Sequence, residues 1–250
     1  CLNEDERVEL ARRVARTARG RMCVVASGHT SDAIEDQIRE LTRVSQTGVD
    51  AVVMISNRLA AKDESDEIAI VNMRRILDAL PGVTFGMYEC PHPYRRPLTD
   101  GMLEAMAETG RFSFIKDTCC DAVLIAHRLK VLDGRIQLFN ANAATILDSL
   151  RDGADGFSGI MANYHPDLYV WLGEHFREQP EKARKLAAAL SVMSAAESHC
   201  HPVDTKYHMD RVGVPMRLHV RNQDESKFGP LDRRFVDDLI ILEDAVRQRL

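Results

Sequence analysis

The feature that most constrains the fold of this chain is a regular alternation of short apolar runs with longer stretches of helical period. Short apolar runs are typical of buried strands, whereas apolar residues at three- and four-residue intervals are typical of amphipathic helices. Such an alternation predicts a parallel sheet covered by helices. The predicted strands are Met22–Ser27, Ala51–Ile55, Thr84–Tyr88, Phe114–Lys116, Ile136–Asn140 and Gly156–Ile160.

Helical periodicity occupies the intervals between these strands. Ser31, Thr99 and Asp121 stand where helix N-caps are expected. After Asn163 the alternation ends and only helical patterns follow. The predicted helices are Glu4–Ala18, Ser31–Gln46, Ser65–Leu80, Thr99–Thr109, Asp121–Val131, Ala143–Arg151, Pro166–Arg177, Glu181–Ser198, Thr205–Arg211 and Leu231–Arg249.

The bulk properties exclude several classes of protein. A net charge of −5 without a basic cluster argues against nucleic acid as a partner. No apolar stretch reaches the roughly 20 residues that span a bilayer, so we expect no membrane partner. The six cysteines show no Cys-x-x-Cys pair, which favours free thiols and a cytoplasmic location. The length of 250 residues suits one (β/α)8 barrel.

Polar residues concentrate at the carboxyl ends of the predicted strands, where parallel α/β folds bind ligands. Lys116 ends one strand and Tyr88 ends the strand before it. A poorly hydrated lysine is a nucleophile toward carbonyls, and a nearby phenol can carry protons. A lysine with its head in water and a tyrosine at a rim are the plain alternatives. Asp117 points to the opposite strand face, so we do not expect it to pair with Lys116.

Three motifs resemble the dihydrodipicolinate synthase/N-acetylneuraminate lyase family. They are Tyr-Glu-Cys-Pro at 88–91, Phe-Ile-Lys-Asp-Thr at 114–118 and Gly-Phe-Ser-Gly-Ile-Met-Ala-Asn at 156–163. The family patterns are Tyr-Asn-x-Pro, Ile-Lys-(Glu/Asp) and Gly-Val-Ile-Ser-x-x-Ala-Asn at similar separations. Pro202–Lys206 is similar to the start of a family C-terminal helix. The resemblance implies a (β/α)8 TIM barrel of the class I aldolase type with a C-terminal helical extension.

The resemblance also implies the chemistry. Lys116 would form a Schiff base with pyruvate or a related 2-oxo acid, and Tyr88 would be the acid/base group of a lyase or aldolase. No organic cofactor is implied, because the lysine imine itself accepts the electrons. A homo-oligomer, dimer or tetramer, is implied as well. The expected substrate-binding residues are Ser158, Gly159, Asn140, His29 and Arg95.

Two departures from the family pattern shape the expectations. The Gly-(Thr/Ser)-Thr-Gly-Glu motif of the family would fall before Cys1, so we expect the first two barrel strands, about 50 residues, to lie outside this chain. Residues 1–163 would then form strands three to eight of the barrel, and residues 164–250 would form the last barrel helix and the C-terminal helices of the same structural unit. Asn57-Arg58 and Pro93 replace a tyrosine pair and a substrate-binding arginine of the family.

Alternatives remain open at several positions. A keto-deoxy sugar acid dehydratase would use the same imine, and a non-catalytic ligand-binding relative would keep the barrel without turnover. His29 is as well explained by a hydrogen-bonded structural histidine as by a pocket residue. His199-Cys200-His201 lacks the ligand spacing of a zinc site, so no metal is expected.

Overall fold

The computed structural model describes residues 2–250, and the chain separates into two compact units, residues 2–139 and residues 140–250. Each unit contains buried apolar side chains of its own, such as Phe85 and Ile115 in the first and Leu172 and Leu190 in the second. The assignment of residues 1–163 to the barrel strands and of residues 164–250 to the last barrel helix and the C-terminal helices stays a prediction.

Within the first unit the strands pair in chain order, and each pairing from β1 to β4 is parallel. The register sets Val25 of β1 opposite Ala51 of β2, and Tyr88 of β3 opposite Lys116 of β4. The predicted parallel sheet is therefore confirmed. The strands are β1 (Val25–Ser27), β2 (Ala51–Ile55), β3 (Phe85–Tyr88), β4 (Phe112–Asp117) and β5 (Gln137–Asn140), whose last residue begins the second unit.

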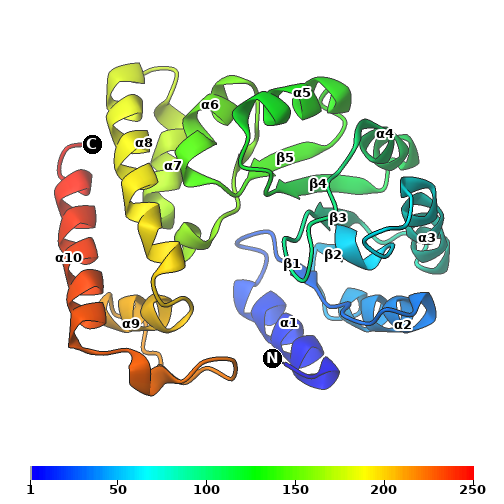
Figure 1. Cartoon of the computed structure of the whole chain (residues 1–250), viewed down its shortest axis with the longest axis horizontal. Helices are drawn as coiled ribbons and strands as arrows, with labels where there is room; N and C mark the ends of the chain where they lie inside the picture. The colour runs from blue at the N-terminus through cyan, green and yellow to red at the C-terminus, as the bar shows by residue number, and fades with distance from the viewer. Residues whose placement is uncertain (1) are drawn as a thin grey trace. The chain divides into compact units, whose positions relative to one another are not determined.

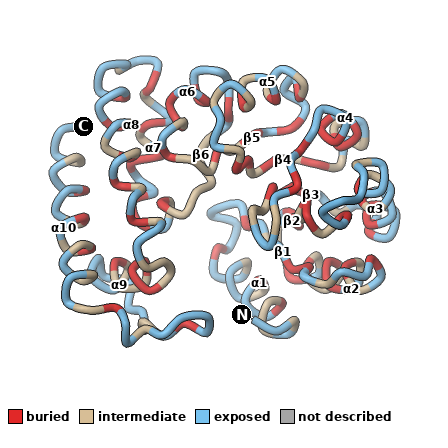
Figure 2. The backbone as a smooth tube through the Cα atoms, in the orientation of Figure 1, coloured by how far each residue is buried: buried red, intermediate tan, exposed pale blue. Residues whose placement is uncertain are grey.

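Helices cover one side of these strands, as Figure 1 shows for α2 to α5. Their buried faces are turned toward the strands in Figure 2, and Leu41 and Val44 of α2 are almost fully buried there. Burial of such an apolar stripe is the main stabilisation of a helix in a globular protein. The helices are α1 (Glu4–Ala18), α2 (Ile34–Ser45), α3 (Asp66–Ala79), α4 (Asp100–Thr109) and α5 (Ala122–Leu132).

The helix starts agree with two of the three predicted N-caps. Thr99 accepts from the backbone N–H of Met102, and Asp121 accepts from two N–H groups of α5. Ser31 was predicted wrongly, because α2 begins only after Ala33. The backbone N–H and hydroxyl of Ser31 donate instead to the buried carboxylate of Glu40, which draws this segment away from the helix.

The second unit is mainly helical. Its apolar core gathers side chains such as Leu172, Leu190 and Leu239 from three helices. The predicted strand Gly156–Ile160 is shorter than expected, because Ile160–Asn163 forms the 3-10 helix η3. The elements are α6 (Ile146–Arg151), β6 (Gly156–Phe157), α7 (Pro166–His175), α8 (Pro180–Met193), α9 (Val203–Arg211) and α10 (Pro230–Arg247).

A buried polar cluster joins three elements of this unit. Glu243 of α10 accepts from Nδ1 of His165, before α7, at 2.8 Å and from Nε2 of His208, on α9, at 3.0 Å. All three side chains are fully buried. Burial opposes ionisation, but the two histidine donors outweigh it and lower the pKa of Glu243. The charged carboxylate thus ties the C-terminal helices together.

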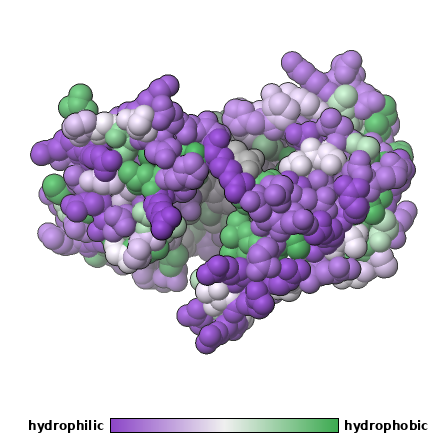
Figure 3. All heavy atoms as spheres, turned by 90° about the horizontal axis from the view of Figure 1, so that it is seen from below, coloured by the Kyte–Doolittle hydropathy of each residue, from purple (hydrophilic) through white to green (hydrophobic). Residues whose placement is uncertain are grey.

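The surface is mostly hydrophilic on the face drawn in Figure 3, with separate hydrophobic areas between the polar ones. Among residues 2–250, no helix is both long enough and apolar enough to cross a lipid bilayer.

A glycine controls how closely α2 approaches the end of β1. A Cβ at Gly28 would lie 2.2 Å from Cγ2 of Val44, a short branched side chain of α2 that cannot swing away. We predict that Gly28→Ala lowers the free energy of unfolding by about 1–3 kcal/mol through overpacking. The measurement is urea denaturation. Gly101→Ala in α4 is the control, because a Cβ there meets no atom within 4 Å and is expected to be neutral or stabilising. Equal midpoints for the two variants would contradict this explanation.

Candidate active site

Tyr88 and Lys116 lie side by side at the carboxyl ends of β3 and β4. The two residues are register partners in the parallel sheet, so their side chains leave the same face. Nζ of Lys116 lies 4.6 Å from the centroid of the Tyr88 ring. Both side chains are half-buried. The predicted placement of the two residues on neighbouring strands is therefore confirmed, and the geometry brings an amine and a phenol together.

The phenol of Tyr88 is held in its protonated form at neutral pH. Burial, with a smaller contribution from the Cys90 thiol, raises the pKa of Tyr88 to about 12. A protonated phenol is both a donor and an acceptor of hydrogen bonds. Tyr88 can therefore deliver a proton to a developing oxyanion and take it back afterwards.

Behind these two residues, on the opposite face of the strands, lies a buried ionic cluster. Glu89 follows Tyr88 and Asp117 follows Lys116, and both carboxylates contact the guanidinium of Arg128 on α5. Nη1 of Arg128 donates to Glu89 at 2.6 Å and also to Asp117, while Nη2 donates to the carbonyl of Leu98. All three charged side chains are at most 1 % exposed.

The charges of this cluster influence one another strongly. Burial raises the pKa of Glu89, and Asp117 adds to this rise while Arg128 opposes it. Burial works against the charge of Arg128, but the two carboxylates outweigh it and raise the pKa of Arg128. Arg128 was not among the residues predicted from the sequence. The available signal was an arginine on the apolar face of α5, between Ile125 and Leu132, both fully buried or nearly so.

His29 is fully buried, and both of its ring nitrogens are hydrogen-bonded to other groups of the protein. Nε2 accepts from the backbone N–H of Ile55 at 2.7 Å, so Nδ1 carries the proton and donates to Oε1 of Gln37 at 2.9 Å. Burial lowers the pKa of His29 to about 4. This is the geometry of a hydrogen-bonded structural histidine, the alternative that the sequence left open.

The loop after Tyr88 is held by Asn57. The side-chain amide of Asn57 donates to the carbonyls of Cys90, His92 and Tyr94 at 2.9, 2.9 and 2.6 Å. Arg95 stands near the end of this loop with an exposed side chain, and its Nε lies 3.9 Å from Glu89. Asn57, which departs from the family pattern, thus stabilises the loop after Tyr88.

Three further predicted site residues belong to the second unit. The fully buried Asn140 donates to Thr145 at 2.9 Å and to Ser149 at 3.1 Å, and the N–H of Ser158 donates to its backbone carbonyl at 2.9 Å. A Cβ at Gly159 would lie 2.5 Å from the carbonyl oxygen of Ala141. Glycine is therefore required at position 159 by close backbone packing. The substrate-binding roles of Asn140, Ser158 and Gly159 stay predictions.

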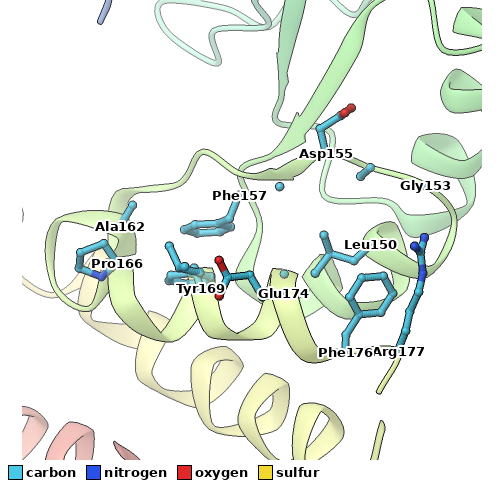
Figure 4. Close-up of a pocket in the computed structure, with 14 residues that line it drawn as sticks. Leu150, Gly153, Asp155, Phe157, Ala162, Pro166, Tyr169, Glu174, Phe176 and Arg177 are labelled. Carbon is cyan, nitrogen blue, oxygen red and sulfur yellow. The ribbon is translucent and has the colours of Figure 1, made fainter. Parts of the chain in front are cut away.

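The second unit also has a cavity of about 570 Å³, drawn in Figure 4. Phe157 of β6 and Tyr169 of α7 stack in it with ring centroids 3.7 Å apart, and Glu174 and Arg177 supply charge at its lining. The lining contains none of the predicted site residues.

Cysteine thiols and metal-ligating side chains are the other groups that could carry chemistry. The cysteines between residues 2 and 250 are free, and burial raises the pKa of Cys119 to about 12, so this residue is a neutral thiol. In the same range, no group of three or more His, Cys, Asp and Glu side chains is arranged to hold a metal ion.

Comparison with known proteins identifies the family. The profile of the Dihydrodipicolinate synthetase family matches residues 1–224, so the chain belongs to this family. A 4-hydroxy-tetrahydrodipicolinate synthase of Anaplasma marginale (strain Florida) is 27% identical over 225 residues, covering 88% of this chain and 72% of the relative. The synthase of Marinobacter nauticus is 22% identical over 236 residues, covering 92% of this chain and 80% of the relative.

Solved structures share the fold. The match to a Ruminococcus gnavus sialic acid aldolase, a catalytic lysine mutant, has a TM-score of 0.86 at 17% identity and covers 99% of this chain and 81% of that protein. An E. coli K12 prophage protein of the dihydrodipicolinic acid synthase family, in complex with pyruvate, matches with a TM-score of 0.82 at 19% identity, covering 98% and 82% of the two chains. These likenesses support the predicted fold class, a parallel α/β structure of the family type.

The burial of His29 generates a pH prediction. Because its folded pKa lies near 4 and the unfolded value near 6.5, the unfolded chain takes up a proton first as the pH falls. Stability from this residue is present above pH 6.5 and is lost between about pH 6.5 and 4, by on the order of 3 kcal/mol. Denaturation at a series of pH values should show a flatter profile for His29→Gln than for the wild type.

The control for this prediction is an exposed histidine of the same unit. His127→Gln removes an exposed imidazole whose Nε2 contacts Asp100, so it controls for the loss of a surface histidine from the same unit. A wild-type slope in His29→Gln would contradict the assignment.

Proposed function

We propose that this protein is a lyase or aldolase that forms a Schiff base between Lys116 and the keto carbon of pyruvate or a related 2-oxo acid. The observation that carries the proposal is the amine of Lys116 4.6 Å from the ring centroid of Tyr88, at the carboxyl ends of paired parallel strands. Family membership supports it, as do relatives named 4-hydroxy-tetrahydrodipicolinate synthase and a similar structure in complex with pyruvate.

The proposed reaction begins with attack of the Lys116 amine on the keto carbon. The carbonyl oxygen takes up protons and leaves as water, and a protonated imine remains between Nζ and the substrate carbon. This iminium withdraws electrons from the neighbouring carbon, where a carbon–carbon bond is then made or broken. Tyr88 donates a proton to the substrate oxygen and accepts it in the reverse step, and hydrolysis of the imine restores the lysine.

The substrate class is a small 2-oxo acid together with an aldehyde or sugar-acid partner. Ser158, Gly159, Asn140 and Arg95 are the proposed substrate-binding residues, and among them Arg95 has an exposed guanidinium that can bind a carboxylate. His29 is left out of this set, because both of its ring nitrogens are hydrogen-bonded within the protein. We propose a cytosolic homo-oligomer that needs neither metal nor organic cofactor. A keto-deoxy sugar acid dehydratase would use the same imine, so an assay for loss of water from such acids belongs beside the aldol assay.

The first test is covalent trapping. Incubation with pyruvate and sodium borohydride should reduce the imine and attach the three-carbon acid to Lys116, because only an iminium is reduced to a stable secondary amine. Peptide mass spectrometry locates the adduct. Lys116→Arg should abolish trapping, since a guanidinium does not form the imine.

The matched control is Lys130→Arg, on an exposed position of α5 in the same unit. This variant should be trapped at the wild-type rate. Wild-type protein that carries no adduct, or an adduct on another lysine, would refute the proposed function. Trapping without turnover of any 2-oxo acid would leave the non-catalytic ligand-binding relative as the better description.

The second test removes the phenol oxygen of Tyr88. We predict that Tyr88→Phe lowers turnover by about 10²–10⁴-fold, the usual contribution of general acid–base catalysis. The ring remains beside Lys116, so trapping at long incubation times should still go to completion. Turnover and the time course of trapping are the two measurements, and a Tyr88→Phe variant with wild-type turnover would exclude the proposed proton transfer.

A further inference from the structure

We infer that Arg128 is a positioning residue that holds Tyr88 and Lys116 in register from behind the sheet, an inference that rests on the proposed function. Each reacting residue is followed directly by a carboxylate on the other strand face, Glu89 in one case and Asp117 in the other. One guanidinium contacts both carboxylates. Beside the backbone ladder of β3 and β4, one group on α5 thereby links the two segments that carry the reacting side chains.

The chemistry of Arg128 suits this task. A guanidinium is planar and presents its N–H groups in a rigid fork, so it fixes the direction of its partners as well as their distance. Its Nη2 also donates to the carbonyl of Leu98, which anchors the fork on the loop before α4. The cluster is almost completely closed to solvent, and water therefore offers no substitute for a lost contact.

The charges around Arg128 restrict which residue can stand at position 128, because two carboxylates require a buried cation there. Two buried carboxylates share the guanidinium of Arg128, the exposed Arg95 lies 3.9 Å from Glu89, and Glu89 stands where the family pattern has a neutral asparagine. The additional carboxylate gives β3 an ionic tie of its own to Arg128. Thr118 reinforces it, because its hydroxyl donates to the backbone carbonyl of Glu89.

The chain offers a matched control at the other end of the same strands. Arg111 precedes β4, and its guanidinium donates to the carbonyls of Leu80 and Val83, which precede β3, at 2.6 and 2.7 Å. Arg111 and Arg128 thus cross-link β3 and β4 at opposite ends. A purely structural role predicts similar consequences for both, whereas a positioning role predicts a chemical defect only at the Arg128 end.

The experiment compares Arg128→Lys with Arg111→Lys in the full chain. Lysine keeps the charge but loses the fork. We expect both variants to lower the thermal midpoint. Only Arg128→Lys should slow borohydride trapping of pyruvate, by roughly tenfold or more, because small displacements of reacting groups are costly. Its rate–pH profile should also shift. Equal trapping rates for the two variants would overturn the inference.

A second readout does not depend on the reaction. Brief labelling with acetic anhydride, followed by peptide mass spectrometry, measures the acylation of Lys116 relative to the exposed Lys130. We expect this ratio to rise several-fold in Arg128→Lys and to stay constant in Arg111→Lys. If wild-type protein is not trapped by pyruvate, the proposed function fails, and the labelling ratio alone then decides whether Arg128 positions Lys116. An unchanged ratio overturns the inference.

Milder variants cover the case in which Arg128→Lys does not fold. Glu89→Gln weakens the contact of Arg128 with the β3 side, and Asp117→Asn weakens its contact with β4. We expect both to slow trapping by roughly three- to tenfold. The larger effect is expected for Asp117→Asn, because Asp117 adjoins Lys116 and also accepts from the N–H of Cys119 at 2.8 Å. Wild-type trapping rates in both variants would overturn the inference.

Discussion

The parallel pairing of β3 with β4 is the constraint on which the site depends. It sets Tyr88 opposite Lys116, and because neighbouring residues of a strand alternate between faces, it also sets Glu89 and Asp117 together on the other face. A shift of one residue in either strand would move Tyr88 or Lys116 to the helix side and a carboxylate to the opposite side. The same ladder of backbone hydrogen bonds thus specifies both the amine–phenol pair and the ionic cluster behind it.

The ionic cluster shows how charged groups are kept in the interior beside the candidate site. Buried ion pairs often add little net stability, because the cost of removing charges from water offsets their attraction. Breaking one is costly, however, because the remaining charge has no partner. A cluster of this kind therefore contributes mainly to the choice of one geometry, and the contact of Arg128 Nη1 with both Glu89 and Asp117 has this character.

The periodicity of the sequence was sufficient for the architecture, because a parallel sheet buries both faces of its strands and leaves a clear apolar signal. The strand Ala51–Ile55 and the helix Glu4–Ala18 were predicted with the bounds that the structure has. The start of α2 was predicted wrongly. Ser31, the expected N-cap, donates its hydroxyl to Glu40, which lies nine residues further along the chain. Arg128 was missed for a related reason, since its partners lie on two other elements and no local pattern points to them.

The residues that depart from the family pattern hold the backbone around the candidate site. Asn57 fixes the loop after Tyr88 through three backbone carbonyls, and Glu89 adds a second carboxylate to Arg128. Neither change removes the amine of Lys116 or the phenol of Tyr88, which remain 4.6 Å apart from nitrogen to ring centroid. Divergence at such positions is therefore compatible with the proposed Schiff-base chemistry, because Asn57 and Glu89 hold the backbone and leave the amine–phenol pair in place.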